Sequence, residues 1–116
     1  MQIEIIKTIY TTGIEKCLSG RVPLPEYRHP VDLLIFETEQ HIRAIHRYCP
    51  HRSKDLAGIK PDQEHNVICP SHTMKLSLYG ENSFEVRKTD DQYFLSTESD
   101  ELDAQSKKQL LMKLVL

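Results

Sequence analysis

With 116 residues, the chain is long enough for one domain with an ordinary hydrophobic core. Its hydrophobic fraction of 39%, charged fraction of 28% and formal net charge of -2 are typical of a soluble globular protein and give no electrostatic reason to expect nucleic acid as a partner. No apolar run approaches the roughly 18–20 residues that span a bilayer, and the N-terminus lacks the basic region and cleavage site of a signal peptide. We therefore expect a cytoplasmic protein without a membrane partner.

The N-terminal quarter predicts one strand followed by a connection. Residues 2–8 contain three isoleucines in weak alternation with polar residues, which predicts a strand. Residues 11–13 carry a turn signal, whereas the pattern of residues 14–20 fits no single element. Residues 21–30 contain three of the six prolines, and proline removes a backbone donor that a ladder or a helix needs. We therefore predict an extended surface connection there and no central strand.

The middle of the chain predicts two pairs of strands. Residues 31–38 are mostly apolar and residues 41–48 alternate, so together they predict a hairpin that turns at Glu39-Gln40. Residues 66–68 and 75–79 predict two shorter strands. The second strand of the hairpin and the first of the short strands each lead directly into a cysteine.

The C-terminal third predicts another hairpin and then a helix. Residues 84–97 alternate on both sides of Asp90-Asp91, which predicts a hairpin. Residues 99–116 begin with acidic residues and continue with lysines, as a helix dipole favours, and three leucines share one helical face. We predict a C-terminal helix there, with a strand over the last eight residues as the alternative. The segment either covers the sheet of its own domain or docks a partner, and we favour the first.

Two short clusters of metal-ligand residues follow the predicted strands. The first is Cys49-Pro50-His51 and the second is Cys69-Pro70-Ser71-His72. Thiolate and imidazole are ligands of zinc and of iron–sulfur centres. Zinc fingers usually place both cysteines in one cluster, whereas each cluster here contributes one cysteine and one histidine. The pattern therefore predicts a metal centre built from two loops, with zinc as the less favoured metal.

This arrangement resembles the Rieske iron–sulfur proteins, in which two cysteines bind one iron of a [2Fe–2S] cluster and two histidines bind the other. The first loop of that family reads roughly C-P-H-R-G-A-x-L, and residues 49–56 read CPHRSKDL. The second loop of the family reads roughly C-P-x-H-G-x-x-F-x-L, and residues 69–78 read CPSHTMKLSL. The resemblance is specific for these two loops and looser for the rest of residues 2–97.

The fold implied by this resemblance is all-β. We expect a Rieske-like antiparallel β-sandwich over residues 1–98, with a cluster-binding subdomain of two loops at about residues 48–80. The short C-terminal helix over residues 99–116 lies beyond the part of the chain that the resemblance covers.

The resemblance also implies a cofactor and its ligands. Cys49 and Cys69 would bind the buried iron of a [2Fe–2S] cluster, and His51 and His72 would bind the outer iron. The activity would be one-electron transfer by a soluble Rieske-type ferredoxin, with no catalytic residue of its own, as a component of an oxidoreductase system. The sequence holds no dinucleotide fingerprint, so we expect a flavin-dependent reductase as the electron donor and an oxygenase or a reductase as the acceptor.

Four positions depart from the Rieske pattern. Ser53 and Thr73 stand where the family usually has glycine, which bears on loop geometry if those positions need a positive φ. Met74 and Leu76 stand where Rieske proteins of high potential carry hydroxyl groups that donate to the cluster sulfurs. Fewer donors to the sulfurs predict a reduction potential near the lower end of the Rieske range, about −150 mV.

The two loops also allow other functions, and three further residues could take part in chemistry. A structural zinc module and a metal-free Rieske fold that binds a partner are the alternatives to electron transfer. Cys17 is the third cysteine, so a disulfide framework is not expected, and a partly buried structural thiol is favoured over a redox-active one. His41 and His46 are weaker ligand candidates, because each lies in a predicted strand without a partner at ligand spacing.

Overall fold

The structure, a computed structural model, describes residues 2–24, 30–49, 54–70, 75–95, 110 and 112–115. Within these ranges the regular secondary structure is almost entirely β-strand. The strands are β1 (Gln2–Thr11), β2 (Lys16–Val22), β3 (Val31–Glu37), β4 (Ile42–His46), β5 (Asn66–Ile68), β6 (Lys75–Ser77), β7 (Phe84–Thr89) and β8 (Gln92–Leu95).

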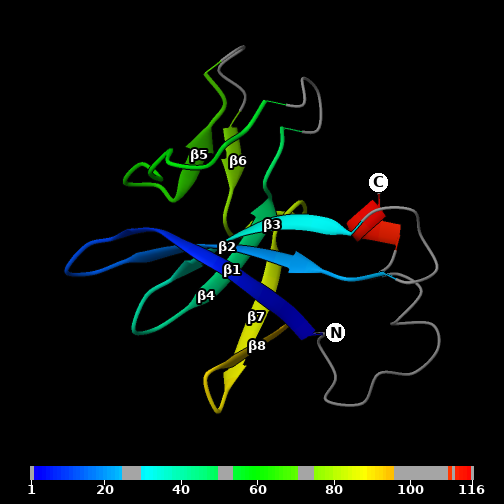
Figure 1. Ribbon diagram of the computed structural model, residues 1–116. Helices are drawn as coiled ribbons and strands as arrows, with labels where there is room; N and C mark the ends of the chain where they lie inside the picture. The colour runs from blue at the N-terminus through cyan, green and yellow to red at the C-terminus, as the bar shows by residue number, and fades with distance from the viewer. Residues whose placement is uncertain are drawn as a thin grey trace.

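Six of the strands form a closed antiparallel barrel in the order β1-β2-β3-β4-β7-β8. The barrel closes where β1 pairs with β8, through Gln2 with Phe94 and Ile3 with Tyr93. The strands β5 and β6 form a separate two-stranded sheet that projects from one end of the barrel, while the β7–β8 hairpin extends at the other end (Figure 1). The prediction of an all-β antiparallel fold is confirmed.

The second strand corrects one sequence prediction. The element left open at residues 14–20 is β2, and β2 continues through Arg21 and Val22, which we had placed in a surface connection. That prediction was wrong for these two residues, because β2 pairs with β1 on one side and with β3 on the other. The first proline of the segment is Pro23, so the ladder can run to Val22, whose buried side chain is 1% exposed.

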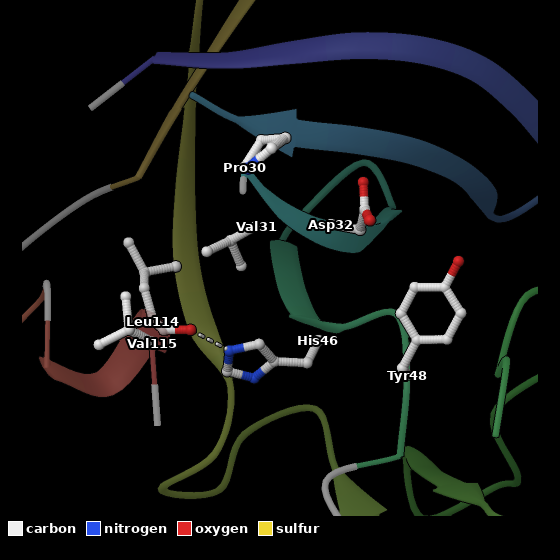
Figure 2. A pocket seen from close by; sticks show the side chains of 7 residues that line it. All are labelled: Pro30, Val31, Asp32, His46, Tyr48, Leu114 and Val115. Carbon is white, nitrogen blue, oxygen red and sulfur yellow. Dashed lines mark hydrogen bonds between the residues drawn. The ribbon is translucent and has the colours of Figure 1, made fainter. Parts of the chain in front are cut away.

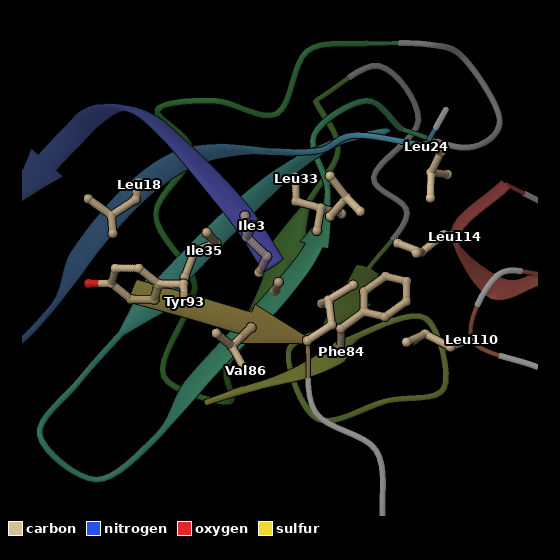
Figure 3. Close-up of a cluster of buried hydrophobic side chains, with 13 residues drawn as sticks. Ile3, Leu18, Leu24, Leu33, Ile35, Phe84, Val86, Tyr93, Leu110 and Leu114 are labelled. Atoms are coloured by element: carbon tan, nitrogen blue, oxygen red, sulfur yellow. The ribbon is translucent and has the colours of Figure 1, made fainter. Parts of the chain in front are cut away.

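Two hydrophobic cores lie on opposite faces of β3. Leu33 and Ile35 point into what we call the barrel core, shown in Figure 3, whereas Leu34 and Phe36 point into what we call the cysteine core. The barrel core comprises Ile3, Leu18, Val22, Leu24, Leu33, Ile35, Ala44, Phe84, Val86, Tyr93, Leu95, Leu110 and Leu114. The cysteine core comprises Cys17, Leu34, Phe36, Ile45, Cys49, Leu56, Val67, Cys69, Leu76 and Leu78. Because both faces of β3 are buried at residues 33–36, these four residues form a continuous apolar run rather than an alternation.

The C-terminal segment is helical at residue 110 and at residues 112–115, and it packs on the barrel (Figures 1 and 3). Leu110 and Leu114 belong to the barrel core, while Met112 and Val115 face outward. These contacts favour the first of the two roles considered for the segment, covering its own sheet. The expected domain boundary near residue 98 lies outside the described residues.

Two polar contacts fix this segment to the barrel. The Nζ of Lys113 donates a hydrogen bond to the backbone oxygen of Ser83 and lies 4.4 Å from the centre of the Phe84 ring. The Nε2 of His46 lies 2.8 Å from the backbone oxygen of Leu114. Among the described residues, no helical segment has both the length and the hydropathy needed to cross a membrane.

Candidate metal centre

The first predicted ligand loop begins where β4 ends. Tyr48 forms an isolated antiparallel bridge with Asp55, and the amide of Cys49 donates to the carbonyl oxygen of Lys54 at 2.8 Å. These contacts bring the two ends of the loop together and form its neck. The side chain of Cys49 lies inside the protein and is 1% exposed.

The second predicted ligand loop is the tip of the β5–β6 hairpin. Three residue pairs form this small sheet, and the last of them, Ile68 with Lys75, is the base of the loop. Cys69 is the first residue after β5, and its side chain is fully buried at 0% exposure. Each predicted loop is therefore flanked by antiparallel pairing, and each cysteine lies at the point where that pairing ends.

The cysteine core brings the two predicted thiol ligands into one apolar environment. Cys49 and Cys69 both belong to it, together with aliphatic side chains such as Leu56 and Val67. No disulfide joins any of the three cysteines. Two buried thiols delivered by separate hairpins fit the thiolate half of a [2Fe–2S] site, because iron prefers thiolate ligands and an apolar wall excludes water.

The other half of the predicted site lies outside the described residues. His51 and His72 are in residues 50–53 and 71–74, as are Ser53, Thr73 and Met74. Within the part of the chain that the structure describes, no three potential metal ligands come together. The four-ligand site therefore stays a prediction, of which the structure places the two cysteines.

An ion pair that the sequence analysis missed spans the neck of the first loop. The guanidinium of Arg47 binds both carboxylate oxygens of Asp55, at 3.1 and 3.0 Å. The hydrogen bonds from Arg47 hold the pKa of Asp55 below its usual value. The two residues are eight positions apart, so only a prediction of the Tyr48–Asp55 bridge would have revealed the pair.

A second arginine connects β4 to the chain that follows the second loop. The Nε of Arg43 donates to the backbone oxygen of Leu78 at 2.8 Å, and its Nη2 donates to the Oγ of Ser83 at 2.8 Å. Ser83 is a buried polar residue, and this bond satisfies its hydroxyl group. Arg43 therefore holds the segment between β6 and β7 against the barrel.

Cys17, the third cysteine, lies in an environment that suits a structural role. Cys17 is fully buried in the cysteine core, and burial, followed by the charge of Glu15, raises the pKa of its thiol to about 12. A thiol of this kind is almost entirely protonated at neutral pH and is a poor nucleophile. This environment favours the structural role for Cys17.

His41 and His46, the two weaker ligand candidates, each pack against an aromatic ring. His46 points toward the C-terminal helix in a cleft of about 260 Å³, where its ring also meets Phe84 edge to face at 5.4 Å between centroids (Figure 2). His41 packs edge to face against Tyr79, with 5.8 Å between centroids. Neither histidine belongs to a group of potential metal ligands among the described residues.

Comparison with known proteins identifies the family. The family model for the Rieske [2Fe-2S] domain matches residues 10–95, which include both predicted ligand loops and every strand from β2 to β8. Among curated proteins and among solved structures, none matches the chain. The family match covers most of the chain and agrees with the all-β fold and the two buried cysteines, so the chain belongs to the Rieske [2Fe-2S] domain family, whose members bind a [2Fe–2S] cluster and transfer electrons.

Proposed function

We propose that the protein is a soluble, cytoplasmic Rieske-type ferredoxin in which Cys49 and Cys69 bind one iron of the cluster and His51 and His72 bind the other. The observation that supports this proposal most strongly is the burial of both cysteines in one core, each carried there by a separate hairpin. When bound, the cluster supplies reversible one-electron chemistry.

The surrounding residues would bind, orient and shield this group. Cys49 and Cys69 would act as thiolates, and the bonded necks of their loops limit how far either sulfur can move. Leu56 and Val67, both 0% exposed, and Leu76 line the same core and exclude water from the thiolate side. An apolar, preformed environment of this kind limits solvent access and lowers the dielectric constant around a metal centre, and it thereby tunes the reduction potential.

The proposed partners follow from what the chain lacks in its sequence. It holds no dinucleotide fingerprint, so electrons from a nicotinamide cofactor require a separate, flavin-dependent reductase as donor. The acceptor would be an oxygenase or another reductase. Residues 1–98 would form the electron-transfer domain, and residues 99–116 would form an extension that covers the barrel.

Spectroscopy of the full chain, purified without oxygen, tests the cofactor. We expect a red-brown protein with about two irons and two sulfides and the EPR signal of a reduced Rieske centre. A colourless protein with about one zinc would instead support a structural zinc module. A protein that binds no metal, even when it is produced anaerobically with iron supplied, would support a metal-free module that binds a partner.

Substitutions test the four ligands. We expect Cys49→Ser, Cys69→Ser, His51→Ala and His72→Ala each to abolish or severely reduce the cluster. His41→Gln is a matched control, because His41 packs against Tyr79, and the variant should keep the wild-type iron content. Loss of iron in a control variant of normal stability would contradict the assignment.

The reduction potential tests the proposed type of ferredoxin. Leu76 is 5% exposed in the cysteine core, and its hydrocarbon side chain can donate no hydrogen bond to a cluster sulfur. We expect a potential near about −150 mV, at the lower end of the Rieske range. A potential above about +100 mV would contradict this type, although the protein would still be a Rieske protein.

A further inference from the structure

The backbone of Arg47 is fixed on both sides. Its amide donates to the carbonyl oxygen of Asp32 in β3 at 3.0 Å, and its own carbonyl oxygen accepts a hydrogen bond from the amide of Leu56 at 2.8 Å. One bond holds Arg47 to the barrel and the other holds it to the chain that returns from the first ligand loop. Arg47 is thus the residue at which the barrel passes into the neck of the loop.

The side chain of Arg47 makes the same connection a second time. Its Nε and Nη2 form the two bonds to the carboxylate of Asp55, and its Nη1 donates to the Oγ of Ser19 at 3.2 Å. Ser19 belongs to β2 and is 2% exposed, so this end of the contact is inside the protein. Bidentate pairs of arginine and carboxylate fix direction as well as distance.

The pair lies at the base of the loop that carries Cys49. Arg47 precedes the Tyr48–Asp55 bridge on one side of the neck, and Asp55 belongs to the bridge on the other. The Oδ1 of Asp55 also accepts a hydrogen bond from the amide of Ala57 at 2.9 Å, which sets the direction in which the chain leaves the neck. Apart from the Cys49–Lys54 bond, the described residues hold the two sides of this neck together through Arg47, Tyr48 and their partners.

We propose that Arg47 is a positioning residue for the cluster, which acts by holding the neck closed through Asp55 and thereby keeping the sulfur of Cys49 in place. This inference rests on the proposed function, since it assumes that Cys49 binds iron. Arg47 is not one of the four predicted ligands. It acts through the loop, and an opened neck would let the Cys49 thiolate take several directions.

The chain contains a matched ion pair for comparison. The Nε of Arg21 lies 3.2 Å from the Oδ1 of Asp32, and the two residues are direct partners in the β2–β3 ladder. Their backbones stay paired by that ladder when the side-chain contact is removed. The neck of the loop has no comparable ladder, because Tyr48 and Asp55 form an isolated bridge. Removal of the Arg47–Asp55 pair should therefore change the properties of the cluster, whereas removal of the Arg21–Asp32 pair should not.

The test compares Arg47→Lys and Asp55→Asn with Arg21→Lys in the full-length holoprotein. Lysine keeps the positive charge but loses the planar fork, and asparagine keeps the shape but loses the charge. We expect both neck variants to release iron to a chelator roughly tenfold faster than wild type at a temperature where each stays folded, and to give a broader EPR signal. Arg21→Lys should match wild type in both measurements. Asp55→Glu, which retains a carboxylate, should recover part of the wild-type release rate.

The outcomes separate this inference from the proposed function. A lower melting temperature in the neck variants, with wild-type iron release and a wild-type EPR signal, would mean that the pair is structural and would overturn the inference alone. Equal effects of Arg21→Lys and Arg47→Lys would also overturn it. Wild-type protein without any cluster would overturn the proposed function, and the inference with it.

Discussion

The barrel and the end of the molecule that carries the two predicted ligand loops are built in different ways. In the barrel, β2 and β3 pair along seven residues each, and the side chains on one face of these strands enter a core of aliphatic and aromatic groups. At the other end, β5 and β6 have three residues each, and the first loop closes on an isolated bridge. The core beneath these loops contains all three cysteines.

This difference indicates what each region depends on. Long ladders and packed apolar side chains stabilise a barrel without further help. A hairpin of two short strands is at best marginally stable alone, so the end with the predicted ligand loops needs side-chain bonds such as Arg47–Asp55 and, we infer, the bound metal.

Removal of the cluster should loosen one region and leave the other intact. After anaerobic chelation of iron, we expect amide hydrogen exchange in β5 and β6 to rise by about three orders of magnitude or more, equivalent to about 4 kcal/mol of lost local stability. Exchange in β2 and β3 should change little, because the ladder of seven residue pairs between them contains no predicted ligand. Hydrogen exchange followed by mass spectrometry measures both regions in one sample.

The opposite result has a clear meaning. A uniform rise in exchange over the barrel and the loops would show that the cofactor stabilises the protein as one cooperative unit. The prediction that the barrel is stable without the cofactor, whereas the loops depend on it, would then be wrong.

Leu33 and Leu34 offer a matched test within one strand. They are neighbours in β3, both are 0% exposed, and they point into the barrel core and the cysteine core, respectively. We expect Leu33→Ala and Leu34→Ala each to lower the free energy of unfolding by about 3 kcal/mol, since each leaves a cavity. Only Leu34→Ala should speed iron release, because only its cavity adjoins the cysteines. Denaturant titration and chelator kinetics measure the two effects, and equal iron release in both variants would contradict the division into two cores.

The sequence predicted the parts of this molecule that short patterns encode. Strands near β3, β4, β5 and β6 followed from apolar runs and alternation, and the two cysteines followed from their neighbours Pro50 and Pro70 and from the spacing of the histidines. The turn at Asp90-Asp91 was also predictable, and both residues have a positive φ there, as aspartate tolerates.

Contacts between distant residues were not predictable in the same way. The closure of the barrel depends on the register of β1 with β8, which no local pattern specifies. The prolines after Val22 led us to place the two residues before them in the connection as well. Proline excludes only its own position from a ladder, so β2 can continue to Val22. Arg47 and Asp55 each resemble ordinary surface charges until the neck of the loop places them together.

Cys17 should make the cysteine core sensitive to alkaline pH. The pKa of its thiol is raised from 9.0 to about 12 in the folded protein, chiefly by burial. The folded state therefore holds this proton more tightly, so the contribution of Cys17 to stability is complete below about pH 9 and is lost as pH rises toward about 12. At pH 10.5 the expected loss is about 2 kcal/mol.

Comparison of wild type with Cys17→Ala isolates this effect. The variant should be less stable than wild type at pH 7.5, because it leaves a small cavity, and the difference should shrink or reverse at pH 10.5. Denaturant curves at the two pH values measure it. A difference that stays constant between the two pH values would contradict the raised pKa of Cys17.

Lys113 should give a smaller effect of opposite sign in the other region. Its pKa lies below the usual value, chiefly because of burial against the barrel and then because of the positive charge of Arg43, while Glu81 acts in the other direction. Between the folded-state pKa and the unfolded value of about 10.4, the unfolded chain binds this proton more strongly, so stability from this group rises with pH. Lys113→Met should remove that rise without changing iron release. Because Lys113 packs against Phe84 at the barrel core and Cys17 lies in the cysteine core, the two variants should change the alkaline slope in opposite directions. If both variants changed it in the same direction, the two regions would not differ in their response to alkaline pH.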